Sequence, residues 1–108
     1  MSAVGENLIR IRQQAAAGSL RVTAHAQSEM AEEEILLDAV LEAMNSGEVL
    51  EDYPLHRRGA CCLLLGITGE GRPLHIVCTT GQPLLIIITV YEPKPPKWAT
   101  PKERRSKT

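Results

Sequence analysis

Aromatic residues and long apolar segments are scarce in this sequence. It contains no Phe, one Trp and two Tyr. The core must therefore be aliphatic, and a wide aromatic platform for stacking single-stranded nucleic acid is excluded. No apolar run reaches the roughly 20 residues that a transmembrane helix needs, and the first twelve residues lack the basic-then-apolar order of a signal peptide. We therefore expect no contact with a membrane.

Cysteine and net charge are sparse as well. The three cysteines, Cys61, Cys62 and Cys78, form no C-x-x-C pair, which argues against a structural zinc site. We expect reduced, buried thiols in a cytoplasmic protein, with no metal and no cofactor. The net charge of −1 argues against binding a polyanion over the whole surface.

The remaining composition is that of one folded domain. Of 108 residues, 44% are hydrophobic and 23% are charged. Hydrophobic periodicity predicts helices over residues 6–17, 25–31 and 32–44, and strands over residues 20–23, 48–53, 60–68, 72–79 and 84–91. The order is helix, strand, helix, helix and four strands, with short links at 69–71 and 80–83. This order predicts an α+β domain with helices on one face of an antiparallel sheet of four to five strands.

Two of the expected strands, residues 60–68 and 84–91, are apolar on both faces. Helices can cover one face of the sheet, and something else must cover the other. Other parts of the same chain, a second copy in a homo-oligomer or a different partner protein would each satisfy this need. The sequence leaves the three alternatives open.

Charge divides the chain into an acidic middle and a basic end. Residues 29–52 carry nine acidic residues and no basic ones, whereas residues 94–108 carry six basic residues and one acidic residue. Four of the seven prolines also lie beyond residue 92. We expect the folded domain to span residues 1–92 and residues 93–108 to form an extended, largely unpacked tail. Such a tail is either a solubilising end or an arm for nucleic acid or an acidic partner.

Two histidines and one tyrosine are the candidates for proton transfer. His25 lies where the first expected strand passes into a helix, His75 lies within the strand 72–79, and Tyr91 ends the last strand. Each also has an ordinary structural role as a capping, core or backbone-bonding residue. Strand register decides whether they meet. Pairing Thr79 with Leu84 puts His75 and Tyr91 on opposite faces, and a shift by one residue puts them on the same face.

Several segments resemble a bacterial family of unknown function, the domain of unknown function 4258. The resemblance rests on VTAHAQSEM, GEVLEDYP, CCLLLG, GRPLHIV and TVYEP, and it covers about residues 20–98. That family is similar to RelE-type toxins. The resemblance therefore implies a metal-free, MqsR-like ribonuclease that acts on RNA and is held by a zinc-finger antitoxin of the MqsA kind, or a relative that has kept only the fold.

The chain departs from the family pattern in one place. Many relatives look basic after the His-Ala pair, whereas here Glu29 and Glu33 stand where the family pattern has arginines. A carboxylate repels phosphate rather than holding it. This departure argues against RNA binding by the helix that follows His25.

Metal-free RNA cleavage needs a base for the 2′-hydroxyl proton, an acid for the leaving 5′-oxygen and a cation for the phosphorane. His25 and His75 supply the base and the acid, with Tyr91 as a reserve acid. Arg72 or Arg21 holds the phosphate, and Thr89 shares a strand face with Tyr91. A non-catalytic interaction or homodimerising module is the main alternative, and a small-molecule-binding domain is a third hypothesis.

Overall fold

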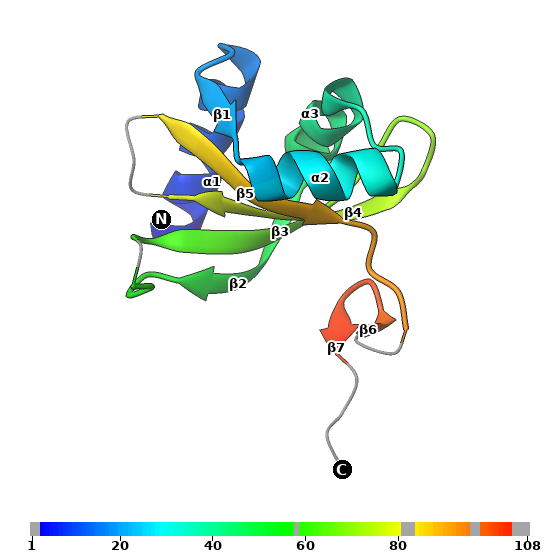
Figure 1. The fold of residues 1–108 in the computed structure, drawn as a ribbon. Coiled ribbons are helices and arrows are strands. Elements are labelled where there is room, and N and C mark those ends of the chain that lie inside the picture. Colours follow the sequence, from blue (N-terminus) through cyan, green and yellow to red (C-terminus); the bar gives the residue numbers. More distant parts are fainter. Residues whose placement is uncertain (1–2, 58, 81–83, 96–97, 105–108) are drawn as a thin grey trace.

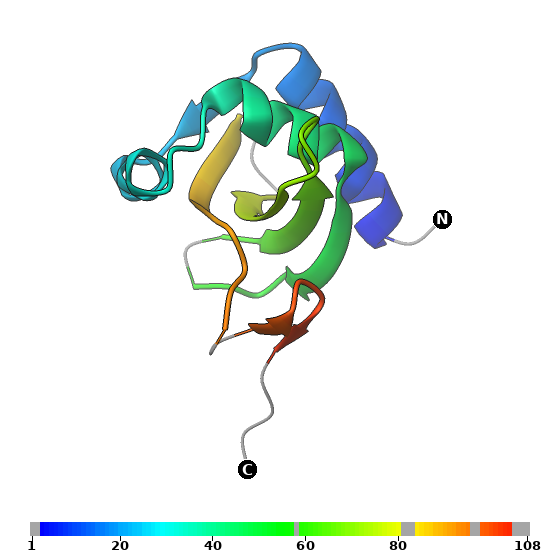
Figure 2. The same cartoon turned by 90° about the vertical axis from the view of Figure 1, so that its right-hand side faces the viewer.

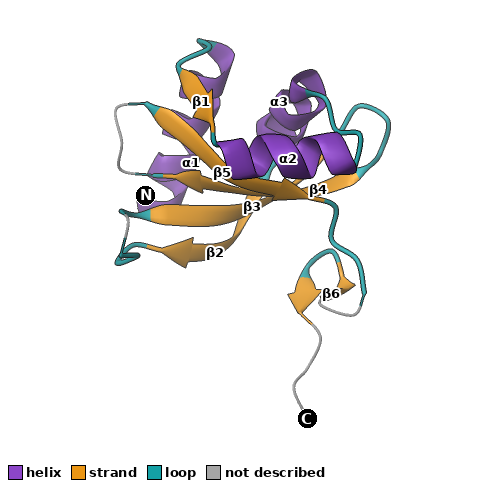
Figure 3. Cartoon of the chain, viewed as in Figure 1, coloured by secondary structure: helices purple, strands orange, loops and turns teal. Residues whose placement is uncertain are grey.

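The structure is a computed structural model that describes residues 3–57, 59–80, 84–95 and 98–104. In chain order the elements are α1 (Ala3–Ala16), β1 (Leu20–Val22), α2 (Ala24–Glu32), α3 (Leu37–Ser46), β2 (Glu48–Tyr53), β3 (Cys61–Ile67), β4 (Pro73–Thr79), β5 (Leu85–Tyr91), β6 (Trp98–Thr100) and β7 (Glu103–Arg104) (Figure 1). The expected α+β class and the expected order through β5 are confirmed. Figure 3 separates the three helices from the strands by colour.

Five strands form one sheet in the order β1-β5-β4-β3-β2. Strands β2 to β5 form the expected antiparallel meander. The prediction of a wholly antiparallel sheet is wrong at one edge, because β1 lies parallel to β5 with Leu20 opposite Leu85. No tight turn links these two strands, since β1 runs directly into α2. Nothing therefore forces their directions to oppose. The link at residues 81–83 lies outside the described residues.

All three helices cover the same face of the curved sheet (Figure 2). Their apolar stripes meet alternate residues of the central strands, which are aliphatic or cysteine. The core they form comprises Ile11, Ala26, Met30, Ile35, Val40, Ala43, Met44, Cys62, Leu64, Leu74, Ile76, Cys78, Leu85, Ile87 and Val90. At Gly66 the backbones of α3 and β3 come so close that an added Cβ would lie 1.8 Å from the Ala43 carbonyl oxygen. Only glycine fits there.

The helix expected over residues 32–44 begins later, at Leu37. Glutamates 32 to 34 end α2 rather than beginning the next helix. Glu34 adopts a left-handed conformation with φ of 56°, and the Ile35 amide donates to the Met30 carbonyl at 2.8 Å. This bond and the burial of Ile35 resemble a Schellman-type helix end. The buried isoleucine outweighs the preference of carboxylates for a helix N-terminus.

The C-terminal tail is packed in part. The prediction of an extended, largely unpacked segment is wrong for residues 98–104, because β6 and β7 pair as a small antiparallel hairpin with Trp98 opposite Arg104. In Figure 1 the hairpin lies on the side of the sheet away from the helices. No helix in the described part of the chain is long and apolar enough to cross a membrane.

Candidate functional site

A hollow of about 450 Å³ is lined by side chains of α2 and of the open face of the sheet, the face opposite the aliphatic core. Its lining joins two residues of α2 to four strands. The lining residues are His25, Glu29, Tyr53, Leu63, Val77, Thr89 and Tyr91. Three of the six predicted site residues therefore meet here, namely His25, Thr89 and Tyr91. His75, Arg72 and Arg21 are not part of this lining.

His25 lies in the first turn of α2. Thr23 caps that helix, because its side-chain oxygen accepts a hydrogen bond from the Ala26 amide at 3.1 Å. The cap fixes where the helix begins and leaves the His25 side chain 70% exposed. One turn later, the Glu29 carboxylate oxygen lies 3.4 Å from His25 Nε2. The imidazole is thus accessible to a substrate and has an acidic neighbour.

Glu29 joins α2 to the last sheet strand. Its Oε1 accepts from the Val90 amide at 3.0 Å and from the Thr89 hydroxyl. Strand β5 has an irregular register beside Val77, and such irregularities re-aim neighbouring groups. The carboxylate at a position where the family pattern suggested an arginine therefore has a local function: it holds the helix that carries His25 against the strand that carries Tyr91.

His75 and Tyr91 are direct cross-strand partners. The register is neither of the two alternatives considered from the sequence, although it places both residues on the same face, as the second one did. His75 Nδ1 lies 3.2 Å from the Tyr91 hydroxyl, and the two rings meet edge to face with centroids 5.2 Å apart. His75 is fully buried. It lies behind Tyr91 rather than at the surface of the hollow.

The tail hairpin covers the end of the open face around His75. The Pro101 carbonyl oxygen lies 2.6 Å from His75 Nε2, and Lys102 Nζ lies 3.0 Å from Glu48 Oε1. His75 and Glu48 are the two cross-strand partners of Leu65, so the hairpin spans this leucine, which is buried. The chain itself therefore covers part of the apolar face.

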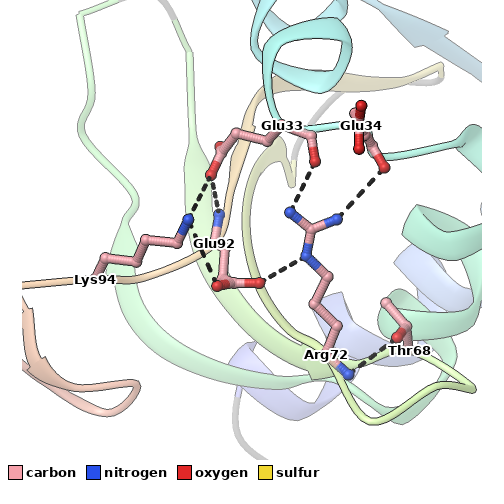
Figure 4. Close-up of polar contacts among 6 residues, drawn as sticks. All are labelled: Glu33, Glu34, Thr68, Arg72, Glu92 and Lys94. Atoms are coloured by element: carbon pink, nitrogen blue, oxygen red, sulfur yellow. Dashed lines mark hydrogen bonds and ion pairs between the residues drawn. The ribbon is translucent and has the colours of Figure 1, made fainter.

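Arg72 was expected to bind phosphate, but its guanidinium group contacts other groups of the protein instead (Figure 4). Its Nε donates to Glu92 at 2.6 Å, and its two terminal nitrogens reach the carbonyl oxygens of Glu33 at 2.8 Å and Glu34 at 3.4 Å. Carbonyls at a helix C-terminus attract cations. Arg72 thus fastens the end of α2 to the strands, and it positions the helix that carries His25 from a distance.

No lysine or arginine lines the hollow among the residues that the structure describes. Arg21 is exposed on the edge strand β1, opposite Ile86. A second hollow of about 580 Å³ is lined by His56, Arg57, Gly59 and Ile88. Ile88 directly precedes Thr89 in β5, and Arg57 is the basic residue of this second lining.

The cysteines are unsuited to nucleophilic chemistry. All three are free and buried. Burial, with smaller contributions from Cys62 and Asp52, raises the pKa of the Cys61 thiol. A hydrogen bond with Cys62, reinforced by burial, raises the pKa of Cys78 further. A raised thiol pKa removes the reactive thiolate near neutral pH. Within the described ranges, no three His, Cys, Asp or Glu side chains are grouped as metal ligands.

Three residues at or behind the hollow were not predicted from the sequence. Glu29 follows His25 by four residues, a spacing that places two side chains side by side on a helix, so a signal for it existed. Tyr53 reaches the hollow from β2, where its hydroxyl donates to Glu51. Pro101 contributes a backbone carbonyl from the tail, and no sequence pattern signals that contact.

The fold and the hollow define a small α+β domain with acid–base groups on the open face of its sheet. The family model described as Domain of unknown function (DUF4258) matches residues 22–92, more than half of the chain, and the protein belongs to this family. The matched segment contains every residue that lines the hollow. No curated protein and no solved structure matches the chain.

Proposed function

We propose that this protein is a toxin-type endoribonuclease that cleaves RNA without a metal ion at the hollow on the open face. The observation that carries the proposal is that His25 and Tyr91, two groups able to transfer protons, face one accessible hollow. The resemblance to RelE-type, MqsR-like toxins supports the substrate class. It also supports control by an antitoxin that binds the protein.

The proposed reaction is attack by the 2′-oxygen on the adjacent phosphorus. The 2′-oxygen forms a bond to phosphorus as it loses its proton, and the bond from phosphorus to the 5′-oxygen breaks as that oxygen gains one. The products are a 2′,3′-cyclic phosphate and a 5′-hydroxyl end. His25 carries out one of these two proton transfers, and Tyr91 carries out the other. His75 Nδ1 contacts the Tyr91 hydroxyl on the side away from the hollow.

The acidic character of the hollow is the chief electrostatic obstacle. Glu29 faces it, but its carboxylate accepts hydrogen bonds from Val90 and Thr89 and lies next to His25. These donors offset part of its charge. In this proposal Arg57, which lines the second hollow, holds the phosphate, because Arg72 is already engaged by Glu92 and by two carbonyls.

A cleavage assay in excess EDTA tests the proposal. The full chain should convert an oligoribonucleotide to 2′,3′-cyclic phosphate products identified by mass spectrometry, and it should leave the DNA analogue intact. His25→Ala should lose about 10²–10⁴-fold in rate, the usual contribution of one acid or base. Ser28→Ala, an exposed change on the same helix, is the matched control. Equal rates for the unchanged chain and His25→Ala overturn the proposal.

Growth of a host cell gives a second test. Expression without a partner gene should arrest growth and degrade RNA, and His75→Ala should relieve both effects. If the two chains express equally and neither damages RNA, the toxin assignment is wrong.

A protein-interaction module is a second candidate, favoured by a separate groove of about 240 Å³ at the start of α3. Its lining includes Leu36, which is 75% exposed, and four carboxylates that outnumber Arg72, the one basic residue among the described residues of the lining. A segment with both apolar and basic side chains complements that surface. Addition of a peptide of alternating Lys and Leu should shift the NMR signals of Leu36, and Leu36→Glu should abolish binding. Leu55→Glu, an exposed change in the loop after β2, is the control.

A further inference from the structure

We propose that the tail carbonyl of Pro101 fixes the tautomer of His75, so that Tyr91 serves as the base of the reaction and His25 as the acid. This inference rests on the proposed function and adds the direction of proton flow to it. The contacts that carry it form one chain, from the Pro101 oxygen through both ring nitrogens of His75 to the Tyr91 hydroxyl.

The direction of this chain follows from which groups can donate. A backbone carbonyl only accepts hydrogen bonds, so the nitrogen 2.6 Å from the Pro101 oxygen, His75 Nε2, must carry a hydrogen. In a neutral imidazole the other nitrogen is then an acceptor. His75 Nδ1 therefore accepts from the Tyr91 hydroxyl at 3.2 Å. The phenolic proton then points toward His75 Nδ1.

A phenol held in this way can remove a proton but is badly placed to give one. The 2′-hydroxyl of RNA transfers its proton to the Tyr91 oxygen while the Tyr91 proton passes to His75 Nδ1, and the 2′-oxygen bonds to phosphorus. His25, in its imidazolium form, gives a proton to the departing 5′-oxygen. The net change is a proton gained at His75 and one lost at His25. Solvent restores both after the products leave.

Pro101 matters most after the proton has moved. His75 is fully buried, and a buried cation is costly unless its hydrogens are bonded. In the imidazolium both ring hydrogens have acceptors, the Pro101 carbonyl at Nε2 and the Tyr91 oxygen at Nδ1. His75 and Pro101 are therefore positioning residues, which act through Tyr91. The tail hairpin is a working part of the site and not only a cover.

The tautomer can be observed without any substrate. In the full chain labelled with ¹⁵N-histidine, His75 should show a hydrogen on Nε2 and none on Nδ1 in its neutral form. The signal should be assigned by its absence from His75→Gln. A hydrogen on Nδ1 overturns the inference whatever the activity of the protein, because Tyr91 would then receive a hydrogen bond from His75 and would not be a base.

A modified substrate separates the acid from the base. RNA with a sulfur atom in place of the bridging 5′-oxygen has a leaving group that needs no proton. On this substrate His25→Ala should recover to within about tenfold of the unchanged chain, although it loses about 10²–10⁴-fold on ordinary RNA. Tyr91→Phe and His75→Gln should stay defective on both substrates. The opposite pattern, with rescue of Tyr91→Phe and none of His25→Ala, overturns the assignment.

The double variant tests whether His75 acts through Tyr91. The glutamine of His75→Gln can still donate to Pro101 but cannot take up a proton. If the two residues form one relay, Tyr91→Phe combined with His75→Gln should be no slower than the slower single variant. Multiplying defects overturn the relay. If the unchanged chain cleaves neither substrate, the proposed function and the base assignment fail together, while the NMR result still decides the tautomer.

Discussion

The two faces of the sheet are built from the same strands and do different work. On the helix-covered face, alternate residues such as Leu64, Ile76 and Ile87 are fully buried in an aliphatic core. On the open face, His75, Thr89 and Tyr91 form a polar row that meets the tail hairpin at His75 and Glu29 of α2 at Thr89. Strands β4 and β5, which carry this polar row, are both largely apolar in sequence. The difference therefore comes from which neighbours cover each residue, and not from composition alone.

The largest effect expected from this contrast is at two adjacent residues of β3. Gly66→Ala should destabilise the fold by about 3 kcal/mol or more, because a methyl group there collides with the α3 backbone. Ile67→Ala, on the next residue and the opposite face, should cost under about 1 kcal/mol, since Ile67 is 45% exposed. Urea denaturation of both variants measures the difference. Similar losses would mean that α3 does not approach β3 as closely as described.

The next largest effect on stability is expected from two valines that lie on opposite faces of the sheet. Val90 on β5 is fully buried in the core, whereas Val77 on β4 lines the hollow. Val90→Ala should cost roughly 2–3 kcal/mol in unfolding free energy, from lost transfer energy and a residual cavity. Val77→Ala should cost under about 1 kcal/mol, because solvent fills the space. If Val77→Ala is the more destabilising change, the hollow is part of a packed core.

A smaller contrast concerns thiols on the two faces. Cys78 faces the core, and its pKa is raised well above the usual value by the Cys62 hydrogen bond and by burial. The folded state then keeps a proton that the unfolded chain releases near pH 8.5, so stability falls as pH rises above that point, by at most about 1.4 kcal/mol per pH unit. Between pH 8 and 10, the unfolding free energy of Cys78→Ala should decline less steeply than that of the unchanged chain. Cys61→Ala, on the open face, should reduce this slope by less than Cys78→Ala does.

The sequence predicted the elements well where local signals were strong. Alternation and short links predicted β2 to β5, and His25 and Tyr91 were singled out and do meet at the hollow. The two helices were separated correctly, but the start of α3 was placed at residue 32 rather than at Leu37, because three glutamates look like a helix start and the burial of Ile35 is a tertiary effect.

The partners of the site residues were harder to predict. Register is set by side-chain packing on both faces and by the irregularity in β5, so the pairing of His75 with Tyr91 could not be read from turn lengths. Arg72 was expected to bind phosphate, but it finds acceptors nearer at hand, the carbonyls that end α2. The contact of Pro101 with His75 joins segments distant in sequence, and it uses a backbone atom that every residue carries.

The smallest expected effect separates the tail from the rest of the open face. Lys102 and Glu48 are both more than half exposed, and an exposed ion pair contributes under about 1 kcal/mol because water and salt screen it. Lys102→Ala should therefore change the unfolding midpoint little. Its effect should appear in the His75 NMR signals, because the neighbouring residue, Pro101, holds the Nε2 hydrogen.

Salt provides the control for this last variant. Raising the ionic strength should shift the His75 signals of the unchanged chain toward those of Lys102→Ala, since it screens the same pair. Lys94→Ala removes a lysine paired with Glu33 and Glu92 near the end of α2 and should leave those signals in place. If Lys102→Ala leaves them unmoved as well, the hairpin is held by contacts other than this pair. Lys102→Ala could instead lower the unfolding free energy by more than about 2 kcal/mol, which exceeds the contribution of an exposed ion pair. That result would mean that the tail belongs to the folded core, and that the two faces differ less than their burial suggests.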